Sequence, residues 1–307
     1  MRLTGSGTAR ADRLFAAVTR GAGGFVVVLV LLVAGFLAVK AAPALRVDRV
    51  NFLTSRTWDV AGHRFGIVDM LWATVTVSAV AMVIALPLAV GVALFITQYA
   101  PRRLARPVAH VVDLLAAIPS IVYGIWGILV LAPLLRPVQD ALGSAHWIPL
   151  FGNEGYSTGT IFDGGVVLAV MILPIITAVA RDVFERTPVA HLEAARALGA
   201  TRWETIRLTV LPHGRSGIVS GAMLGLGRAL GETVALYLIL SKPPAGPFSP
   251  SLFAGGETFA SKIASNAAEF STPTQTGAYL AAGLVLFALT FVVNAVARWI
   301  ARRGDAA

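Results

Sequence analysis

The chain has 307 residues, of which 56 % are apolar and only 13 % are charged. A soluble domain of this size carries roughly twice that share of charged residues, so the composition excludes an ordinary soluble protein. The absence of cysteine excludes disulfides, thiol nucleophiles and cysteine-based metal sites. The formal net charge of +9 would suit a nucleic-acid binder, but the basic residues flank apolar segments, where they set membrane topology. We therefore predict an all-α membrane protein.

Six apolar segments are long enough to cross a bilayer, which takes roughly 20 residues. They lie at about 24–42, 67–98, 108–135, 164–180, 217–240 and 277–300. Together they predict a single transmembrane domain over residues 24–304. Three of the segments contain a proline, at Pro87, Pro119 and Pro174, and each proline is expected to bend its helix.

The first apolar segment is longer than the core of a signal peptide and ends in "AVKAAPALRV", which is a poor cleavage site. We therefore expect a retained first span. Residues 1–23 precede it as a cytoplasmic segment, and the later part of that segment is predicted to lie on the membrane surface as an interfacial helix.

The placement of lysine and arginine predicts the orientation of the chain. With the N-terminus inside, the inner segments hold 16 of the 25 basic residues and the outer segments hold 8. Because cytoplasmic segments carry an excess of these residues, both termini are predicted to be cytoplasmic, although the first outer loop is itself basic.

The longest inner connection, at 181–215, reads "RDVFERTPVAHLEAARALGATRWETIRLTVLPHGR". Pro188 predicts the start of a helix, and Gly199 predicts its end. Thr201 is a candidate cap for a second helix that stops at Pro212. Two short helices separated by a glycine are typical of a docking element, and an ordinary solvated loop is the alternative interpretation.

Part of this connection, "EAARALGATRWETIRLTVLP", resembles the EAA loop of ABC-importer permeases. That pattern runs Glu-Ala-Ala, three residues, Gly, about nine residues, an aliphatic residue, any residue and Leu-Pro. The matching residues are Glu193, Ala194, Ala195, Gly199, Leu211 and Pro212. Thr209 stands where the family usually has isoleucine or valine. The resemblance implies a type I ABC-importer permease fold, in which this loop couples the membrane domain to an ATP-binding subunit.

The chain lacks an ATP site of its own, since it has no Gly-x-x-x-x-Gly-Lys-Ser/Thr pattern and none of its lysines follows a glycine. We expect a non-catalytic subunit without a cofactor, and ATP and Mg²⁺ bound by a partner ATPase. The five histidines lie in unrelated segments without ligand spacing, so no metal site is predicted.

The fifth apolar segment contains a pair of charges in "GLGRALGET", residues 225–233. Arg228 lies about 11 residues into this segment, which is about half of a roughly 30 Å core at roughly 1.5 Å per residue. Glu232 follows four residues later and is predicted on the same helix face. A charge at this depth costs several kcal/mol, so both side chains should face the bundle interior or an aqueous path.

Two interpretations of this pair remain open. The planar guanidinium of Arg228 suits an oxyanion such as phosphate because it donates two parallel hydrogen bonds. In that case the pair lies on the path of an anion, and Glu232 holds the arginine and limits how tightly the anion binds. The alternative is an internal salt bridge in which the two charges neutralise each other and pin neighbouring helices.

Three stretches sharpen the resemblance: "MLGLGRALGETVA", "DLLAAIPSIVYGIWGILVLAP" and "RDVFERTP". They are similar to the permease subunits of phosphate-specific importers, of the PstC type, and the similarity extends from about residue 65 to the end. It implies that Arg228 and Glu232 belong to the phosphate path or its gate. It also implies a PstA-type permease as partner in a heterodimer, two copies of a PstB-type ATPase, a PstS-type phosphate-binding protein, and a place in the bacterial inner membrane.

Three hydroxyl side chains are candidates for pore lining, namely Thr76, Ser120 and Tyr123, and hydrogen bonding within the core explains them equally well. Two other functions stay open. One is the same machine for another oxyanion, such as sulfate or molybdate, which competition between anions would distinguish. The other is a membrane scaffold that senses phosphate without moving it, which a test for ATP-dependent flux would distinguish.

Overall fold

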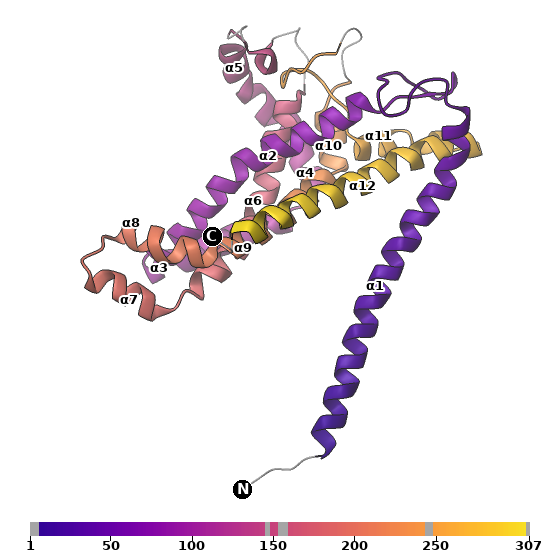
Figure 1. The fold of residues 1–307 in the computed structure, drawn as a ribbon. Helices are drawn as coiled ribbons and strands as arrows, with labels where there is room; N and C mark the ends of the chain where they lie inside the picture. The colour runs from indigo at the N-terminus through magenta and orange to yellow at the C-terminus, as the bar shows by residue number, and fades with distance from the viewer. Residues whose placement is uncertain (1–5, 145–147, 153–158, 243–247, 305–307) are drawn as a thin grey trace.

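The computed structural model describes residues 6–144, 148–152, 159–242 and 248–304 (Figure 1). The described chain is helical except for its loops and a short antiparallel ribbon of β1 (Trp58–Asp59) and β2 (Arg64–Phe65). Within it, five helical segments are long and apolar enough to cross a membrane, namely Asp12–Val47, Val68–Tyr99, Ser120–Gly143, Ile161–Glu185 and Pro273–Trp299. The predicted all-α membrane class is confirmed.

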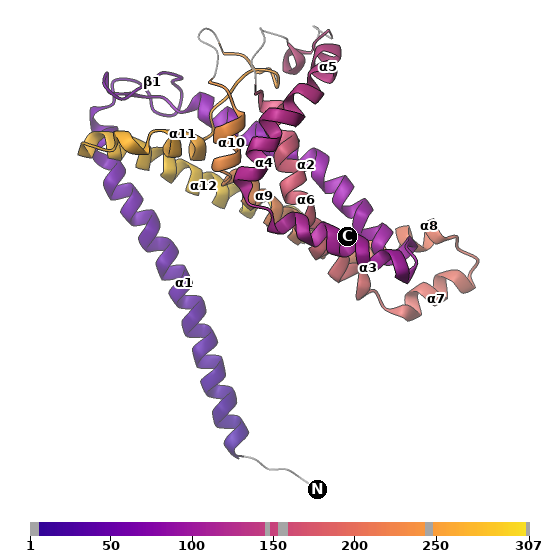
Figure 2. The ribbon, with the colours of Figure 1, turned by 180° about the vertical axis from the view of Figure 1, so that it is seen from behind.

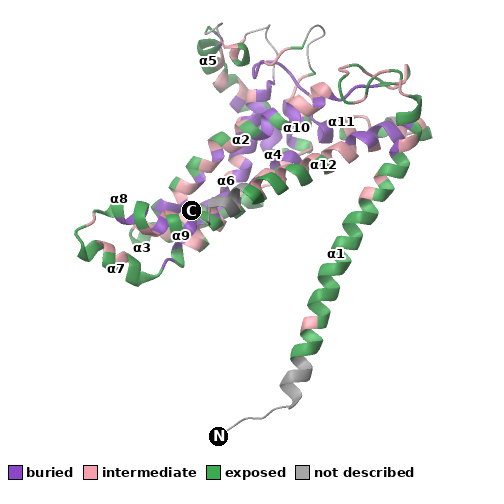
Figure 3. Cartoon of the chain, viewed as in Figure 1, coloured by how far each residue is buried: buried purple, intermediate pink, exposed green. Residues whose placement is uncertain are grey.

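The first helix, α1 (Ser6–Val47), is continuous from the first described residue. Residues 6–23 are therefore helical and continuous with the first predicted span, their position on the membrane surface stays a prediction, and residues 1–5 lie outside the described part. Three glycines between positions 21 and 24 each cost about 1 kcal/mol of helix propensity, and the long apolar run after them continues the helix. Most of α1 is exposed, and only its C-terminal end packs against α12 (Pro273–Gly304) (Figure 3).

The centre of the bundle is the pair formed by α2 (Val68–Leu94) and α6 (Ile161–Glu185). A stripe of small residues on α2 is fully buried at four-residue spacing, and its members are Ala73, Val77, Ala81, Ala85 and Ala89. Small residues on one face let two helices approach closely in a membrane, where van der Waals contact replaces the hydrophobic effect as the source of association. A π turn, η1 (Phe95–Tyr99), extends α2.

Helix α9 (Leu211–Leu230) packs against α6 through its glycines. A Cβ atom on Gly217 would lie 2.3 Å from a methyl group of Val183, and one on Gly225 would lie 3.0 Å from the Ile176 side chain. The two helices are therefore closer than any larger side chain at these positions permits. Helices α2, α6 and α9 thus form a core held together by small residues.

The third apolar segment is two helices, so the predicted single span at 108–135 is wrong. Helix α3 (Arg102–Ala117) ends before Ile118 and Pro119, which have extended backbone with ψ of 130° and 140°. The physical reason is that a proline ring pushes the preceding residue out of the helical region. A continuous helical run follows, made of α4 (Ser120–Trp126), the π turn η2 (Gly127–Leu131) and α5 (Ala132–Gly143).

The fifth apolar segment is also interrupted, so the predicted span at 217–240 is not one helix. Helix α9 ends at Leu230 and α10 (Val234–Ile239) begins after a break at 231–233. Gly231 favours this end because glycine stabilises a helix poorly. The Thr233 hydroxyl then donates to the Gly231 carbonyl at 3.2 Å, a local bond that competes with helix continuation. By contrast, Pro87 and Pro174 lie inside α2 and α6, which continue through them.

Figures 1 and 2 place the remaining elements at two opposite ends of the bundle. Short helices α7 (Val189–Ala197) and α8 (Arg202–Thr205) lie at one end, near the start of α9. The strand ribbon, α10 and α11 (Phe259–Ser265) lie at the other. Two 3-10 turns, η3 (Pro149–Phe151) and η5 (Ala267–Glu269), complete the described elements.

We expect Gly217→Ala to destabilise the protein, because the new methyl group would meet Val183 at 2.3 Å and force α6 and α9 apart. The expected loss of unfolding free energy is about 1–3 kcal/mol. Denaturant unfolding in detergent measures it. The matched control is Gly227→Ala on the same helix, where no heavy atom lies within 4 Å and a neutral or slightly stabilising effect is expected. Equal effects of the two substitutions would contradict the packing argument.

Candidate translocation site and coupling loop

Arg228 lies in the last turn of α9, next to the break at 231–233. A cation is favourable there because the free carbonyl groups give the C-terminal end of a helix partial negative charge. Its side chain is exposed in the single chain. After the break, α10 (Val234–Ile239) continues the chain from Arg228 and packs against α4.

Tyr123 connects the two interrupted segments. Its ring is buried, and its hydroxyl donates a hydrogen bond of 2.8 Å to the carbonyl of Leu115, across the break between α3 and α4. Helix α4 also packs closely on α10, since a Cβ atom on Gly124 would lie 3.1 Å from the Cα of Ala235. The later halves of both interrupted segments are therefore packed together, with Arg228 beside them.

Glu232 does not share a helix face with Arg228, so that prediction is wrong. The helix ends at Leu230, and Glu232 lies in the break that follows. Its carboxylate accepts a hydrogen bond from the backbone N–H of Ala235 at 3.3 Å, at the start of α10. Within the described part of the chain, Arg228 and Glu232 form no ion pair. The salt-bridge alternative is therefore not formed in this conformation.

The other two candidate pore residues lie apart from this arrangement. Thr76 is buried on α2 and Ser120 is the half-buried first residue of α4. Neither side chain forms a hydrogen bond with any residue that the structure describes. Of the three predicted hydroxyls, Tyr123 is the one that spans a helix break, through its bond to Leu115.

The predicted end of the first loop helix at Gly199 is confirmed. Gly199 has a φ of +84°, the left-handed conformation that favours glycine. Its N–H bonds to the carbonyl of Arg196 at 2.9 Å, and the N–H of Ala200 bonds to Ala195 at 3.1 Å. These two bonds form a Schellman motif, which closes α7 after Leu198.

The predicted cap at Thr201 is confirmed as well. The Thr201 hydroxyl accepts from the backbone N–H of Glu204 at 3.3 Å, and the Glu204 carboxylate accepts from the backbone N–H of Thr201 at 2.7 Å. These bonds from the Thr201 backbone and hydroxyl lower the pKa of Glu204. Because the charged form is the one stabilised, this cap is present above the ordinary pKa of glutamate. It is lost only as the pH falls through the lowered value.

The second loop helix does not stop at Pro212, which corrects the sequence prediction. Helix α8 continues through the π turn η4 (Ile206–Val210) into α9, and Pro212 is the second residue of α9. A proline here lacks one hydrogen bond and crowds the turn before it. The wider π turn immediately before α9 accommodates this crowding. The loop is therefore joined rigidly to the helix that carries Arg228.

A buried cluster joins the loop to the bundle. Phe184 at the end of α6, Ile206 and Val210 of η4, and Ala93 and Leu94 of α2 pack together. A displacement of the loop is therefore transmitted directly to α2, α6 and α9, because close-packed contacts deform little.

The loop presents an apolar tip that the sequence pattern did not single out. Leu198 is 90 % exposed and Trp203 is 55 % exposed, on either side of Gly199. Large apolar side chains exposed together mark an interaction surface. Glu193 and Ala194 lie exposed on α7 beside this tip, and Ala195 is half-buried. In the sequence, the available sign of this exposed tip was Leu198, which directly precedes the capping Gly199.

The sequence pattern described as "binding-protein-dependent transport system inner membrane component" matches residues 85–305. The chain belongs to this family. Its members are inner membrane permeases of ABC importers, and the helical fold agrees with that assignment. Within the described residues, no group of three or more histidine, aspartate or glutamate side chains is arranged to hold a metal ion.

Two relatives and one solved structure show the extent of the likeness. The chain is 54 % identical over 299 residues to "phosphate transport system permease protein PstC 2" of Mycobacterium tuberculosis, covering 95 % of this chain and 92 % of the relative. It is 54 % identical over 300 residues to the PstC protein of Mycobacterium leprae, covering 95 % and 94 %. A chain of a bacterial alginate ABC transporter shares the permease fold with a TM-score of 0.58 at 16 % identity, covering 96 % of each chain.

We expect Gly199→Ala to weaken the coupling loop without a steric clash, because no atom lies within 4 Å of the new methyl group. The cost is the left-handed backbone, roughly 1–2 kcal/mol for a residue with a Cβ atom. Denaturant unfolding in detergent measures this loss of stability, and a matched Ala200→Gly control should leave the Schellman motif intact. Unchanged stability in Gly199→Ala would contradict the role of this motif.

Proposed function

We propose that the chain is the non-catalytic permease subunit of an ATP-driven importer of inorganic phosphate. The observation that carries the proposal is Arg228, which lies exposed in the last helical turn before a break in an apolar segment, in a chain 54 % identical to named phosphate permeases.

Arg228 is proposed to lie on the phosphate path. An exposed guanidinium deep in a bilayer faces lipid, a partner subunit or water, and facing lipid costs several kcal/mol. A path between this chain and a second permease removes that cost and gives the arginine an oxyanion to bind. The break at 231–233 supports this interpretation, because irregular backbone is tolerated at membrane depth where it lines a water-filled cavity.

Glu232 is proposed to shape this path without neutralising the arginine. Its carboxylate is tied to the N-terminus of α10 by the hydrogen bond from Ala235. A fixed negative charge near Arg228 reduces the affinity for an anion, which helps release. Tyr123 is proposed to line the same region, and Thr76 and Ser120 are proposed as more distant lining positions.

The loop at 181–215 is proposed to dock on the ATPase. The residues matched to the family pattern are Glu193, Ala194, Ala195, Gly199, Leu211 and Pro212. The first four belong to α7 and its cap, and the last two begin α9. The exposed tip at Leu198 supports docking, and the continuous helix from α8 into α9 supports transmission of the movement to Arg228.

The proposed assembly has one PstA-type permease, two PstB-type ATPases that bind ATP and Mg²⁺, and a PstS-type phosphate-binding protein. The loop end of the bundle then faces the cytoplasm and the end with α10 and α11 faces outward. We propose that the assembly works by alternating access. ATP binding opens the bundle outward, phosphate passes Arg228, and ATP hydrolysis returns the bundle to its starting conformation. Residues 1–23 and both termini are proposed to be cytoplasmic.

We expect Arg228→Gln to abolish phosphate uptake while the complex still assembles and hydrolyses ATP. Loss of a charge-assisted hydrogen bond is worth about 1.5–3 kcal/mol, so uptake should fall at least about tenfold. The measurement is ATP-driven uptake of labelled phosphate into vesicles holding the four components, with sulfate as competitor. Wild-type uptake that sulfate does not reduce assigns the path to phosphate.

The matched control is Arg46→Gln, because Arg46 is likewise exposed in the last turn of a helix, at the end of α1. This variant should transport phosphate as the wild type does. Normal uptake by Arg228→Gln, and by an Arg228→Ala, Glu232→Ala double variant, would overturn the proposed path. Absence of ATP-dependent flux in the wild type would favour a sensing scaffold instead.

A further inference from the structure

A second cationic site lies at the end of the bundle opposite the coupling loop. A cavity of about 300 Å³ is lined by Tyr237 of α10, by Lys242 and Glu257, and by Lys262 and Ser265 of α11. A neighbouring cavity of about 250 Å³ shares Lys242, Glu257 and Lys262 with it. The two hollows therefore meet at the same three charged side chains.

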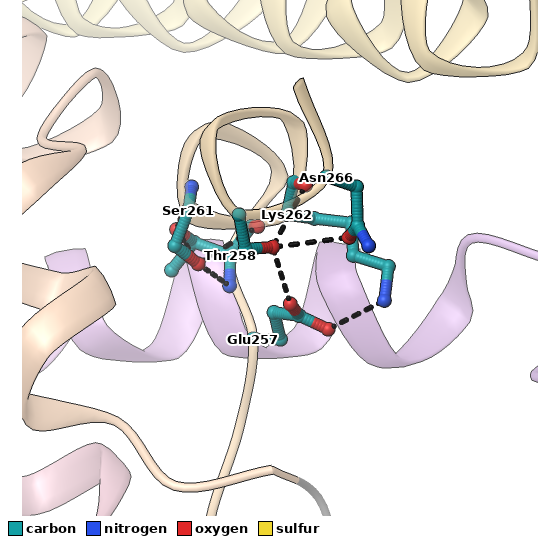
Figure 4. Close-up of polar contacts among 6 residues, drawn as sticks. Glu257, Thr258, Ser261, Lys262 and Asn266 are labelled. Carbon is teal, nitrogen blue, oxygen red and sulfur yellow. Dashed lines mark hydrogen bonds and ion pairs between the residues drawn. The ribbon is translucent and has the colours of Figure 1, made fainter. Parts of the chain in front are cut away.

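Two of these charges are fixed by internal bonds. The Lys262 ammonium and the Glu257 carboxylate form an ion pair at 2.9 Å, with side chains only 18 % and 21 % exposed (Figure 4). The other Glu257 oxygen accepts from the Ser265 hydroxyl at 3.2 Å. An ammonium has three N–H donors and this ion pair takes one of them. Lys262 is thus held in place with donors left for a ligand.

Lys242 supplies the excess positive charge. Among the residues that the structure describes, it forms no ion pair, and it lines both cavities. In the second cavity, Arg56 is paired with Asp69 at 2.6 Å. After each carboxylate is matched with its own partner, one lysine charge remains. A concave site with one excess cation concentrates anions from solution.

The cavity wall belongs to the helix that follows Arg228 along the chain. Tyr237 lines the cavity and lies on α10, which begins directly after the break that follows the last turn of α9. The same chain segment therefore carries a cation at the interrupted helix and forms the wall of the cationic cavity.

We propose that this cavity is a loading station for inorganic phosphate, which holds the anion on Lys242 and Lys262 before it reaches Arg228. The inference rests on the proposed function. Glu257 keeps the affinity of this site for phosphate low, because its fixed carboxylate lies beside the ammonium groups. A transient site needs this low affinity, because an anion bound tightly at the entrance would not move on.

The test uses the complete importer in vesicles, with labelled phosphate uptake measured against the concentration of phosphate-loaded binding protein. Lys242→Gln is expected to lower the maximal rate about tenfold at low salt, Lys242→Glu further, and Lys242→Arg little. The half-saturating concentration of the binding protein should stay unchanged. The difference between wild type and Lys242→Gln should shrink as ionic strength rises, because salt screens an exposed charge.

The matched control is Lys40→Gln, which removes the same charge from an exposed position on α1, away from the cavity. Wild-type uptake in this control, together with loss in Lys242→Gln, supports the station. Unchanged uptake in Lys242→Gln, while the wild type transports phosphate, overturns the station alone. A changed half-saturating concentration with an unchanged maximal rate also overturns it, since Lys242 would then be a docking contact for an acidic surface of the binding protein. A wild-type complex that moves no phosphate overturns the proposed function itself.

Discussion

Close approach between helices α2, α6 and α9 is the constraint on which the rest of the structure depends. Alanines on α2 and glycines on α9 bring both helices against α6 at distances that larger side chains would prevent. The interrupted segments need this support. A helix that breaks within a membrane leaves backbone groups without intrahelical partners, and only neighbouring protein or water satisfies them. The rigid core therefore permits irregular backbone directly after the helical turn that carries Arg228, and α9 joins that turn to the loop at 181–215 without a break.

The two cationic positions follow a common design. At the interrupted helix, Arg228 forms no ion pair with any described residue, while Glu232 is held at the start of α10. At the opposite end from the coupling loop, Lys242 is left unpaired among the described residues, while Glu257 is held by Lys262 and Ser265. In both places a carboxylate is held by its own partners, and the cation of the same region forms no ion pair with it among the described residues. Under the proposed function, such an arrangement attracts an anion and keeps its binding weak, as a transport path requires.

Local features of the sequence determined much of this protein. Apolar length predicted helices at all six segments, because crossing a bilayer depends on composition alone. The caps at Gly199 and Thr201 were predicted correctly, since each depends on a few neighbouring residues. The spacing of the EAA pattern pointed to the family, and the depth of Arg228 made it the candidate for the site that we propose.

Tertiary structure decided what those local rules could not. The break after Leu230 removed the shared face of Arg228 and Glu232, because neighbouring helices stabilise an end that helix periodicity alone does not predict. Pro119 ended a helix whereas Pro87 and Pro174 did not, since the outcome depends on how the freed backbone is packed. The cavity at Lys242 joins residues from α10, α11 and the loops between them. Side chains that far apart in sequence meet only through packing, so composition and spacing give no signal for them.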